Sequence, residues 1–288
     1  MRSWLYTPAN TPNRMIQAGM YGSDGIIFDL EDAVALSEKD EARLLLEGLL
    51  PLIRASLERT HPAVKIAVRI NGLDTPYWQD DLKAVVGSGG AIIRVPKVES
   101  AAEVEEIAHA LSLLEAELHI PDGSVHLQVL LETPRGVEEA FRIGAASPRV
   151  IAFSFGAEDY CSALGIHRNG PRVALDYPRA RIASAASACG IEAYDAAYGF
   201  LDNADALVLE CAHAKALGFH GKSAIHPKQV AAINGEFSFS AQEVREAKAI
   251  LASLEKNQDG VSSLEGRMID KPVIAWAHRV LAAAEGNR

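Results

Sequence analysis

The sequence has few cysteines, no long apolar run and no excess of positive charge. Cys161, Cys189 and Cys211 are too few and too widely spaced for a disulfide framework or a cysteine-based zinc site. They are typical of reduced thiols in a cytosolic protein. No stretch approaches the roughly 20 apolar residues that a membrane helix needs, and the opening MRSWLYTPAN lacks a signal-peptide core. We therefore expect a cytoplasmic protein that does not insert into a membrane.

Acidic residues outnumber basic ones, 38 to 28, which gives a formal net charge of −10. This balance argues against nucleic acid as a partner, because a nucleic-acid-binding protein carries a basic surface. Any bound polyanion must be held by a local basic cluster. The 288 residues, 49% of them hydrophobic, suit a globular protein with a large core. The length is about that of one (β/α)₈ barrel with a short appendage.

Short β-rich runs alternate with amphipathic helical stretches, which is the pattern of a parallel sheet with helical crossovers. Apolar residues recur three and four positions apart in the helical stretches 40–57, 101–118 and 180–189. The seventh strand has the weakest pattern, and Asp195 after it is compatible with a loop. We expect eight strands, the number that closes a barrel, at 4–6, 25–29, 65–70, 91–95, 127–131, 150–155, 192–194 and 221–225.

The pattern changes after Pro227, where helices are expected around 229–233, across 241–255 and from Pro272 onward. The sequence therefore predicts an α/β fold in two parts. Residues 1–233 form a TIM-barrel catalytic domain. Residues 234–288 form a C-terminal helical lid or oligomerisation segment.

Ionisable or polar residues follow most of the expected strands. In a (β/α)₈ barrel the carboxyl ends of the strands form the mouth of the active site, so these side chains are candidates for its chemistry. They are Asp29, Glu31 and Asp32 after the second strand, Arg69 and Asn71 at the third, Arg94 and Lys97 at the fourth, Glu132 after the fifth, and Glu158 and Asp159 after the sixth.

So many carboxylates in one pocket would repel each other, and a divalent cation would neutralise them. Oxygen ligands without a matching His or Cys cluster favour Mg²⁺ or Mn²⁺ over zinc, and Mg²⁺ commonly takes only one or two carboxylates. We predict Glu132 and Asp159 as the ligand pair. The other carboxylates are predicted to support the site by hydrogen bonds to metal-bound water or to Arg69; these are Asp29, Glu31, Asp32 and Glu158.

Arg69 lies near the exit of the third strand, where a guanidinium can bind a carboxylate or enolate oxygen in a bidentate manner. A structural salt bridge to Asp29 or Glu31 is the alternative interpretation. The two are compatible, because a neighbouring carboxylate would also hold the arginine in place.

Taken together, these segments resemble the citrate lyase beta subunit and citramalyl/malyl-CoA lyase group of the HpcH/HpaI aldolase superfamily. The resemblance extends from residue 2 to residue 272. It is carried by RSWLYTPANTPNRM, DGIIFDLEDAV, VRIN, RVPKVES, LLETPRGV, FGAEDY with Gly165 soon after, GKSAIHPKQV and GRMIDKP. Each segment alone is modest, but the combination is highly specific.

The resemblance implies a barrel whose metal is held by Glu132 and Asp159, with Arg69 contacting the carboxylate or carbonyl oxygen of the substrate. It implies that Asp270, in the GRMID segment, enters the site of a neighbouring subunit on a lid and carries a proton. The protein would then be a homo-oligomer, a trimer or a hexamer. From composition alone, Asp270 is only an acidic residue at a helix N-terminus.

The resemblance also implies a thioester arm, either CoA or the phosphopantetheine of an acyl-carrier protein. Arg14 is the candidate for its phosphates, with Lys97 and the 221–227 loop as further candidates; a solvated surface arginine is the alternative for Arg14. The chain departs from the family at Pro8-Ala9, where many members have Pro-Gly, and glycine would permit close approach or positive φ. Trp4 and Tyr6 replace more aliphatic residues, so the acyl preference is open.

These features predict a Mg²⁺-dependent carbon–carbon lyase. Its substrate would be a β-hydroxyacyl thioester of the citramalyl, malyl or citryl type, cleaved to an acetyl thioester and a 2-oxo acid. One alternative is a metal-dependent 2-oxo-acid aldolase that acts without CoA. Another is a non-autonomous citrate lyase beta subunit that acts on an acyl-carrier protein. The acyl group, the direction of the reaction and the base that deprotonates the hydroxyl are left open.

Overall fold

The computed structural model describes residues 1–168, 173–256, 262–264 and 267–286. The chain forms two compact units, Met1–Gly235 and Glu236–Arg288. The boundary lies two residues beyond the one expected from the sequence, in the last turn of helix α10 (Pro227–Phe237).

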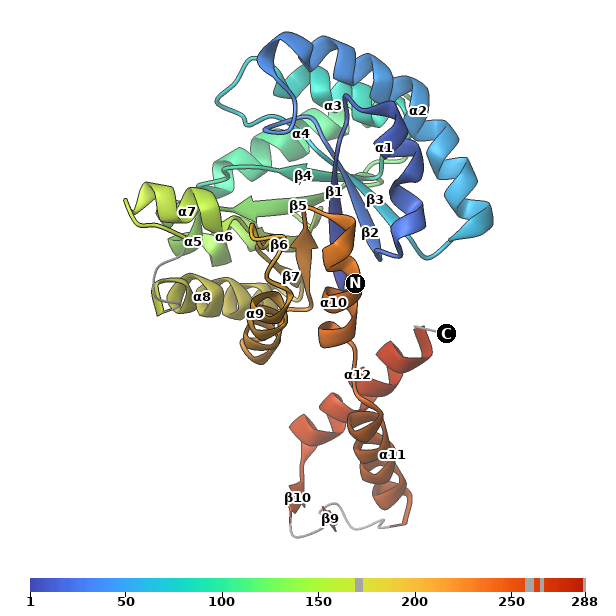
Figure 1. Ribbon diagram of the computed structural model, residues 1–288, viewed down its shortest axis with the longest axis vertical. Helices are drawn as coiled ribbons and strands as arrows, with labels where there is room; N and C mark the ends of the chain where they lie inside the picture. The colour runs from blue at the N-terminus through green and yellow to red at the C-terminus, as the bar shows by residue number, and fades with distance from the viewer. Residues whose placement is uncertain (169–172, 257–261, 265–266, 287–288) are drawn as a thin grey trace. The chain divides into compact units, whose positions relative to one another are not determined.

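In the described part of the chain, eight parallel strands close into a barrel in the order β1 to β8 (Figure 1). This confirms the predicted fold class, and β1 completes the ring by pairing with both β2 and β8. The first and last residues of each predicted strand lie within two positions of those observed. The strands are β1 Ser3–Pro8, β2 Gly25–Asp29, β3 Lys65–Arg69, β4 Ile92–Val95, β5 His126–Leu131, β6 Val150–Phe155, β7 Glu192–Asp195 and β8 Gly221–Ala224. Asp195 belongs to β7 and pairs with Lys222 of β8, so its interpretation as a loop residue is wrong.

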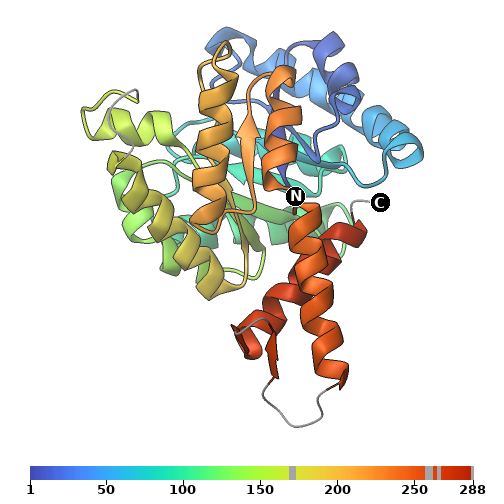
Figure 2. The ribbon, with the colours of Figure 1, turned by 60° about the horizontal axis from the view of Figure 1, so that its bottom comes forward.

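Helices follow the strands on the outside of the barrel, and α9 and α10 lie on either side of β8 (Figure 2). Helix α2 shows why they pack there, since its buried residues Ala42, Leu46, Leu50, Ile53 and Leu57 recur at three- and four-residue spacing. In this unit the described helical segments are α1 Pro12–Gln17, η1 Ala18–Tyr21, η2 Leu36–Glu38, α2 Lys39–Thr60, α3 Trp78–Gly87, α4 Ala101–Glu117, α5 Pro134–Glu138, α6 Ala140–Ala145, α7 Ala157–Ala163, α8 Val173–Cys189, α9 Ala204–Ala216 and α10.

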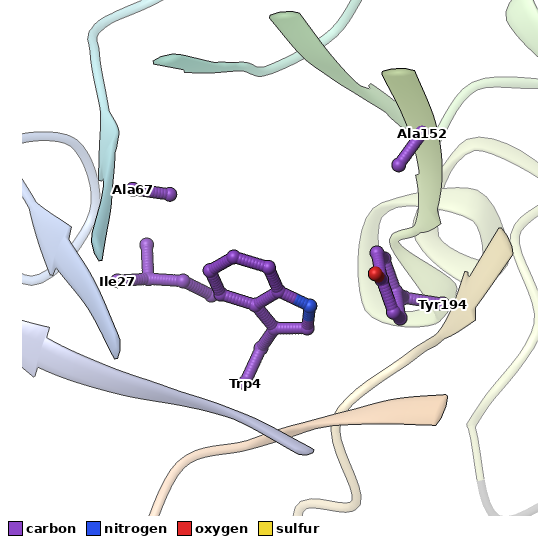
Figure 3. Packing of buried hydrophobic residues seen from close by; sticks show 5 residues of the cluster. All are labelled: Trp4, Ile27, Ala67, Ala152 and Tyr194. Atoms are coloured by element: carbon purple, nitrogen blue, oxygen red, sulfur yellow. The ribbon is translucent and has the colours of Figure 1, made fainter. Parts of the chain in front are cut away.

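A plug of side chains fills the amino-terminal part of the barrel (Figure 3). The rings of Trp4 and Tyr194 meet edge to face at 5.7 Å, and they pack with Ile27, Ala67 and Ala152. Gly25 leaves room for the indole, because a Cβ there would lie 2.3 Å from the Trp4 ring. The barrel is therefore a packed core rather than a pore, and a ligand has room only nearer the carboxyl ends of the strands.

The second unit contains α11 Ala241–Lys256, the antiparallel pair β9 Ser262–Leu264 and β10 Arg267–Ile269, and α12 Lys271–Gly286. Ala247 and Ile250 of α11 pack against Ala277 and Val280 of α12. Among the residues described in both units, no helix is both long enough and apolar enough to cross a membrane.

Candidate active site

A cavity of about 660 Å³ opens at the carboxyl ends of the barrel strands. Its lining comes from β1, β2, β3, β5, β6 and β8 and from the loops that follow several of them. Arg69, Glu132 and Asp159 all belong to this lining. Residues that are far apart in the sequence thus share one pocket, because successive parallel strands end on the same side of the barrel.

Glu132 and Asp159 both line the cavity, and their carboxyl groups lie close together. Glu132 follows β5 and is 2% exposed, while Asp159 lies half-buried in the first turn of α7. Burial and the negative charges of Glu31 and Asp159 raise the pKa of Glu132 well above its usual value, and the two carboxyl groups are within hydrogen-bonding range. A buried pair of like charges is stable only if a proton or a cation is shared between them.

The chemistry of this pair suits a hard divalent cation, because both groups offer oxygen ligands. The described residues contain no group of three or more His, Cys, Asp or Glu side chains placed to hold a metal. A cation on this pair would therefore need water or substrate oxygens to complete its coordination, which is the usual situation for Mg²⁺.

Two backbone features position Glu132. Gly156, which follows β6, faces its side chain, and a Cβ there would lie 2.4 Å from Glu132 Oε2. On the other side, the backbone N–H of Lys97 donates to Glu132 Oε1 at 2.8 Å. Lys97 has φ of 55°, an unusual conformation for a residue with a side chain. The strained backbone of Lys97 therefore serves to orient the buried carboxylate.

Arg69 is held by carboxylates from the loop after β2. Its Nε and Nη2 donate to the two oxygens of Asp29 at 2.7 and 2.6 Å, and its Nη1 lies 2.7 Å from Glu31 and 3.4 Å from Asp32. Burial alone would lower the pKa of Arg69, but the neighbouring acidic groups outweigh it and raise the pKa well above its usual value. Arg69 forms the salt bridge to Asp29 and also lines the cavity. Its guanidinium therefore presents a positive charge to the cavity in a fixed position.

Lys39 supports the acidic loop and was missed by sequence reasoning. It is buried at the start of α2, and its Nζ donates to the carbonyl oxygens of Leu30 and Glu31 at 2.6 and 2.7 Å. Burial lowers its pKa despite the nearby carboxylates. The only signal in the sequence was a lysine a few residues after the acidic LEDAV segment. Its burial depends on how α2 packs.

The candidates for the thioester arm differ in position. Arg14 is exposed and lines the cavity. Lys97 lies outside the lining, and its ammonium is 3.1 Å from Glu31. The 221–227 segment contributes Ser223, Ile225, His226 and Pro227 to the cavity lining, so it stays a candidate. Its lysine, Lys222, is not part of that lining, because it is fully buried with its ammonium 2.6 Å from Asp195 and 2.7 Å from Glu210.

One further expectation is corrected. Arg94 does not reach the mouth of the barrel, because it is fully buried within the interior, bonded to Gln128. Ala9 is buried and does not have the positive φ that would demand glycine, so its replacement of glycine leaves the backbone unstrained. Glu158 lines the cavity, but its carboxylate is largely exposed and lies 3.6 Å from Arg168.

Asp270 belongs to the second unit. Its side chain is exposed and accepts a hydrogen bond from the backbone N–H of Val273 at 3.2 Å, which caps the start of α12. Its entry into the site of another subunit stays a prediction.

Fold and site together define an enzyme, a (β/α)₈ barrel with paired carboxylates and a fixed arginine at its catalytic end. A family model described as HpcH/HpaI aldolase/citrate lyase matches residues 2–227. The chain belongs to this family and is a lyase related to CoA-dependent enzymes.

Similar proteins cover nearly the whole chain. The citrate lyase subunit beta of Leuconostoc mesenteroides subsp. cremoris is 37% identical over 289 residues, 99% of this chain and 94% of that protein. A (3S)-malyl-CoA thioesterase of Cereibacter sphaeroides is 35% identical over 99% of this chain and 94% of that one. The crystal structure of CitE from Mycobacterium tuberculosis in complex with magnesium, acetoacetate and coenzyme A has a TM-score of 0.79 and 32% identity, over 99% of this chain and 98% of that chain.

Proposed function

We propose that this protein is a Mg²⁺-dependent carbon–carbon lyase that cleaves a β-hydroxyacyl thioester into an acetyl thioester and a 2-oxo acid. The observation that carries the proposal is the buried Glu132 carboxylate facing Asp159 on the cavity wall that also holds Arg69. The similar CitE protein, solved with magnesium and coenzyme A, supports the same assignment.

Glu132 and Asp159 would hold the metal, with Mg²⁺ favoured and Mn²⁺ as an alternative for the same oxygen ligands. When bound, the cation supplies Lewis-acid polarisation of the hydroxyl and ketone oxygens of the substrate. Asp29, Glu31 and Asp32 do not compete for it, because they pair with Arg69. Glu158 is exposed enough to contact water at the rim of the site.

Arg69 stabilises the negative charge that develops on the acetyl-thioester enolate when the carbon–carbon bond breaks. Its bidentate bond to Asp29 and its contact with Glu31 fix the guanidinium before the reaction begins. A charge that needs no reorganisation at the moment of reaction is the usual source of large catalytic effects.

Asp270 delivers the proton that converts the enolate into the acetyl thioester, and removes it in the condensation direction. Its carboxylate is exposed at the start of α12, where it is free to reach a second chain. The proposal therefore includes a homo-oligomer in which one subunit completes the site of another. Arg14, exposed on the cavity wall, meets the phosphates of the thioester arm.

A substrate panel tests the proposal. Purified protein with Mg²⁺ is given citramalyl-, malyl- and citryl-CoA, and the 2-oxo acid, acetyl-CoA and free CoA are all measured. A 2-oxo acid released together with acetyl-CoA supports the lyase. Free CoA with an intact hydroxy acid would show thioester hydrolysis and refute it. Arg69→Lys and Glu132→Gln should lose the activity, and the surface variant Glu139→Gln should keep it.

Two arms of the panel separate the alternatives. A free 4-hydroxy-2-oxo acid is cleaved only if the protein is an aldolase that acts without CoA. Acyl-carrier-protein thioesters are cleaved, and CoA esters ignored, only if the chain is a non-autonomous citrate lyase beta subunit. Turnover of either substrate alone would overturn the choice of a CoA ester.

A further inference from the structure

Arg94 is a fully buried cation that contacts no carboxylate in the described part of the chain. It differs in this from Arg69, Arg149 and Arg179, each of which bonds to carboxylates. Its Nε and Nη2 donate to Gln128 Oε1 at 3.1 and 2.8 Å. An unpaired charge inside a barrel is costly and calls for an explanation.

The remaining bonds of Arg94 lead to two hydroxyl groups. Its Nη1 donates to Tyr6 Oη at 3.1 Å and to Ser223 Oγ at 3.2 Å. Both side chains line the cavity, although they come from β1 and β8. The Arg94 guanidinium also stacks on the rings of Trp4 and Tyr6, at 5.6 and 5.4 Å from their centroids. The buried Arg94 guanidinium thus fixes the positions of the two hydroxyl groups through hydrogen bonds from the barrel interior.

Each hydroxyl accepts from Arg94 and keeps its own proton for another acceptor. In the described ranges neither hydroxyl donates to a protein acceptor. A hydroxyl that accepts from a cation becomes a stronger donor, because hydrogen bonds in a chain polarise one another. Tyr6 and Ser223 therefore present two strengthened O–H donors to the cavity, with a positive charge behind them.

The surroundings restrict what these donors can bind. Arg69 lies over the Tyr6 ring, 4.9 Å from its centroid, so the donors adjoin the proposed reaction site. Much of the nearby wall is apolar, including Leu130, Phe155 and Ala196. A ligand that offers two acceptor oxygens and a negative charge would satisfy both hydroxyls and balance Arg94. A methyl group or a hydrogen atom would leave them unpaired.

We infer that Tyr6 and Ser223, backed by Arg94, form a subsite for a second carboxylate on the 2-oxo acid half of the substrate. The inference rests on the proposed function and makes it more specific, since it favours thioesters whose cleavage yields a 2-oxo dicarboxylate. A site built to bond a polar group discriminates strongly against analogues that lack it. Tyr6 and Ser223 are then specificity-determining residues.

The test compares two 2-oxo acids in the presence of Mg²⁺. Binding of oxaloacetate, which has the second carboxylate, and of pyruvate, which lacks it, is measured calorimetrically on the full chain. Wild type should prefer oxaloacetate by about tenfold or more, and Tyr6→Phe and Ser223→Ala should each weaken oxaloacetate binding about tenfold while leaving pyruvate binding nearly unchanged. The double variant should lose the preference.

Controls keep the outcomes apart. Tyr177→Phe removes a phenol oxygen that bonds Glu138 on the surface and should change neither affinity. If Tyr6→Phe does not fold, Ser223→Ala alone decides, because it removes a single oxygen. A preference that survives in the double variant, or a pyruvate affinity that falls equally, overturns the subsite while turnover of thioesters still supports the lyase. A wild type that neither binds 2-oxo acids nor cleaves any thioester overturns both.

Discussion

Replacing Glu132 by Gln should stabilise the metal-free protein while abolishing its response to Mg²⁺. Burial, together with Glu31 and Asp159, raises the pKa of Glu132 in the folded state. A carboxyl group with a raised pKa stabilises the fold below its unfolded pKa of about 4.5, and this contribution is lost as pH rises through the folded pKa. At neutral and alkaline pH the wild-type Glu132 carboxyl group therefore lowers the stability of the metal-free fold. The glutamine side chain removes this destabilisation, and a bound cation offsets it.

The size of the Mg²⁺ response follows from mass action. At a free concentration about 100 times the dissociation constant, a ligand adds about 2.7 kcal/mol to the free energy of unfolding. The barrel unit has 235 residues, for which the entropy of unfolding is about 0.5 kcal/mol/K. Saturating Mg²⁺ should therefore raise the Tm of the wild type by roughly 5 °C, and that of Glu132→Gln by less than about 1 °C.

The assay is thermal unfolding in EDTA and in Mg²⁺, at about pH 6 and about pH 8. Glu158→Gln is the matched control, because its exposed carboxylate lines the same cavity next to Asp159; it should keep most of the Mg²⁺ response. The reasoning is refuted if Glu132→Gln responds to Mg²⁺ as the wild type does. It is also refuted if the metal-free variant is less stable than the wild type at the higher pH.

Three further variants follow from the structure. Arg69→Lys cannot keep the bidentate bond to Asp29, so kcat should fall by about 10²- to 10³-fold in steady-state assays with a smaller change in KM. Glu115 is fully buried; although burial raises its pKa, hydrogen bonds from Arg149 and from backbone N–H groups lower it to about 2. Its stabilisation, about 3 kcal/mol above pH 4.5 and lost as pH falls towards 2, should disappear in Glu115→Gln, measured by urea unfolding against pH. Asp195→Asn breaks two fully buried ion pairs and should cost about 3–5 kcal/mol in urea.

Each of these three has a result that contradicts it. Near-normal kcat in Arg69→Lys would mean that the guanidinium does not act on the developing charge. An acid-unfolding profile of Glu115→Gln that matches the wild type would show that its ion pair with Arg149 adds no stability. A loss under about 1 kcal/mol in Asp195→Asn would mean that Glu210 alone compensates the buried Lys222 ammonium and Arg179 guanidinium.

The barrel and the location of its acidic mouth could be predicted because both depend on local patterns. Short β-rich runs mark the strands, and polar residues appear where each run ends, as Glu132 does after β5. The parallel topology then brings these ends together without any knowledge of particular contacts. The pairing of Glu132 with Asp159 required only that neighbouring strands end side by side.

Other features of the site could not be predicted, because they depend on which side of a strand a side chain faces and on contacts with residues remote in the sequence. Arg94 lies one residue before the end of β4 and points into the interior, whereas Lys222, near the start of β8, points towards Glu210 of α9. Neither direction can be read from the strand pattern alone, because a shift of one residue reverses it. The contacts of Lys39 and the positive φ of Lys97 depend on the packing of helices and loops that are remote in sequence from the groups they position.

A crystal structure of the full-length protein grown with Mg²⁺ tests the central claim most directly. The account predicts one ion bound to an oxygen of Glu132 and an oxygen of Asp159, each at about 2.0–2.1 Å, with Arg69 still bonded to Asp29. An ion held elsewhere, or the two carboxylates turned apart without a shared ion, would contradict it.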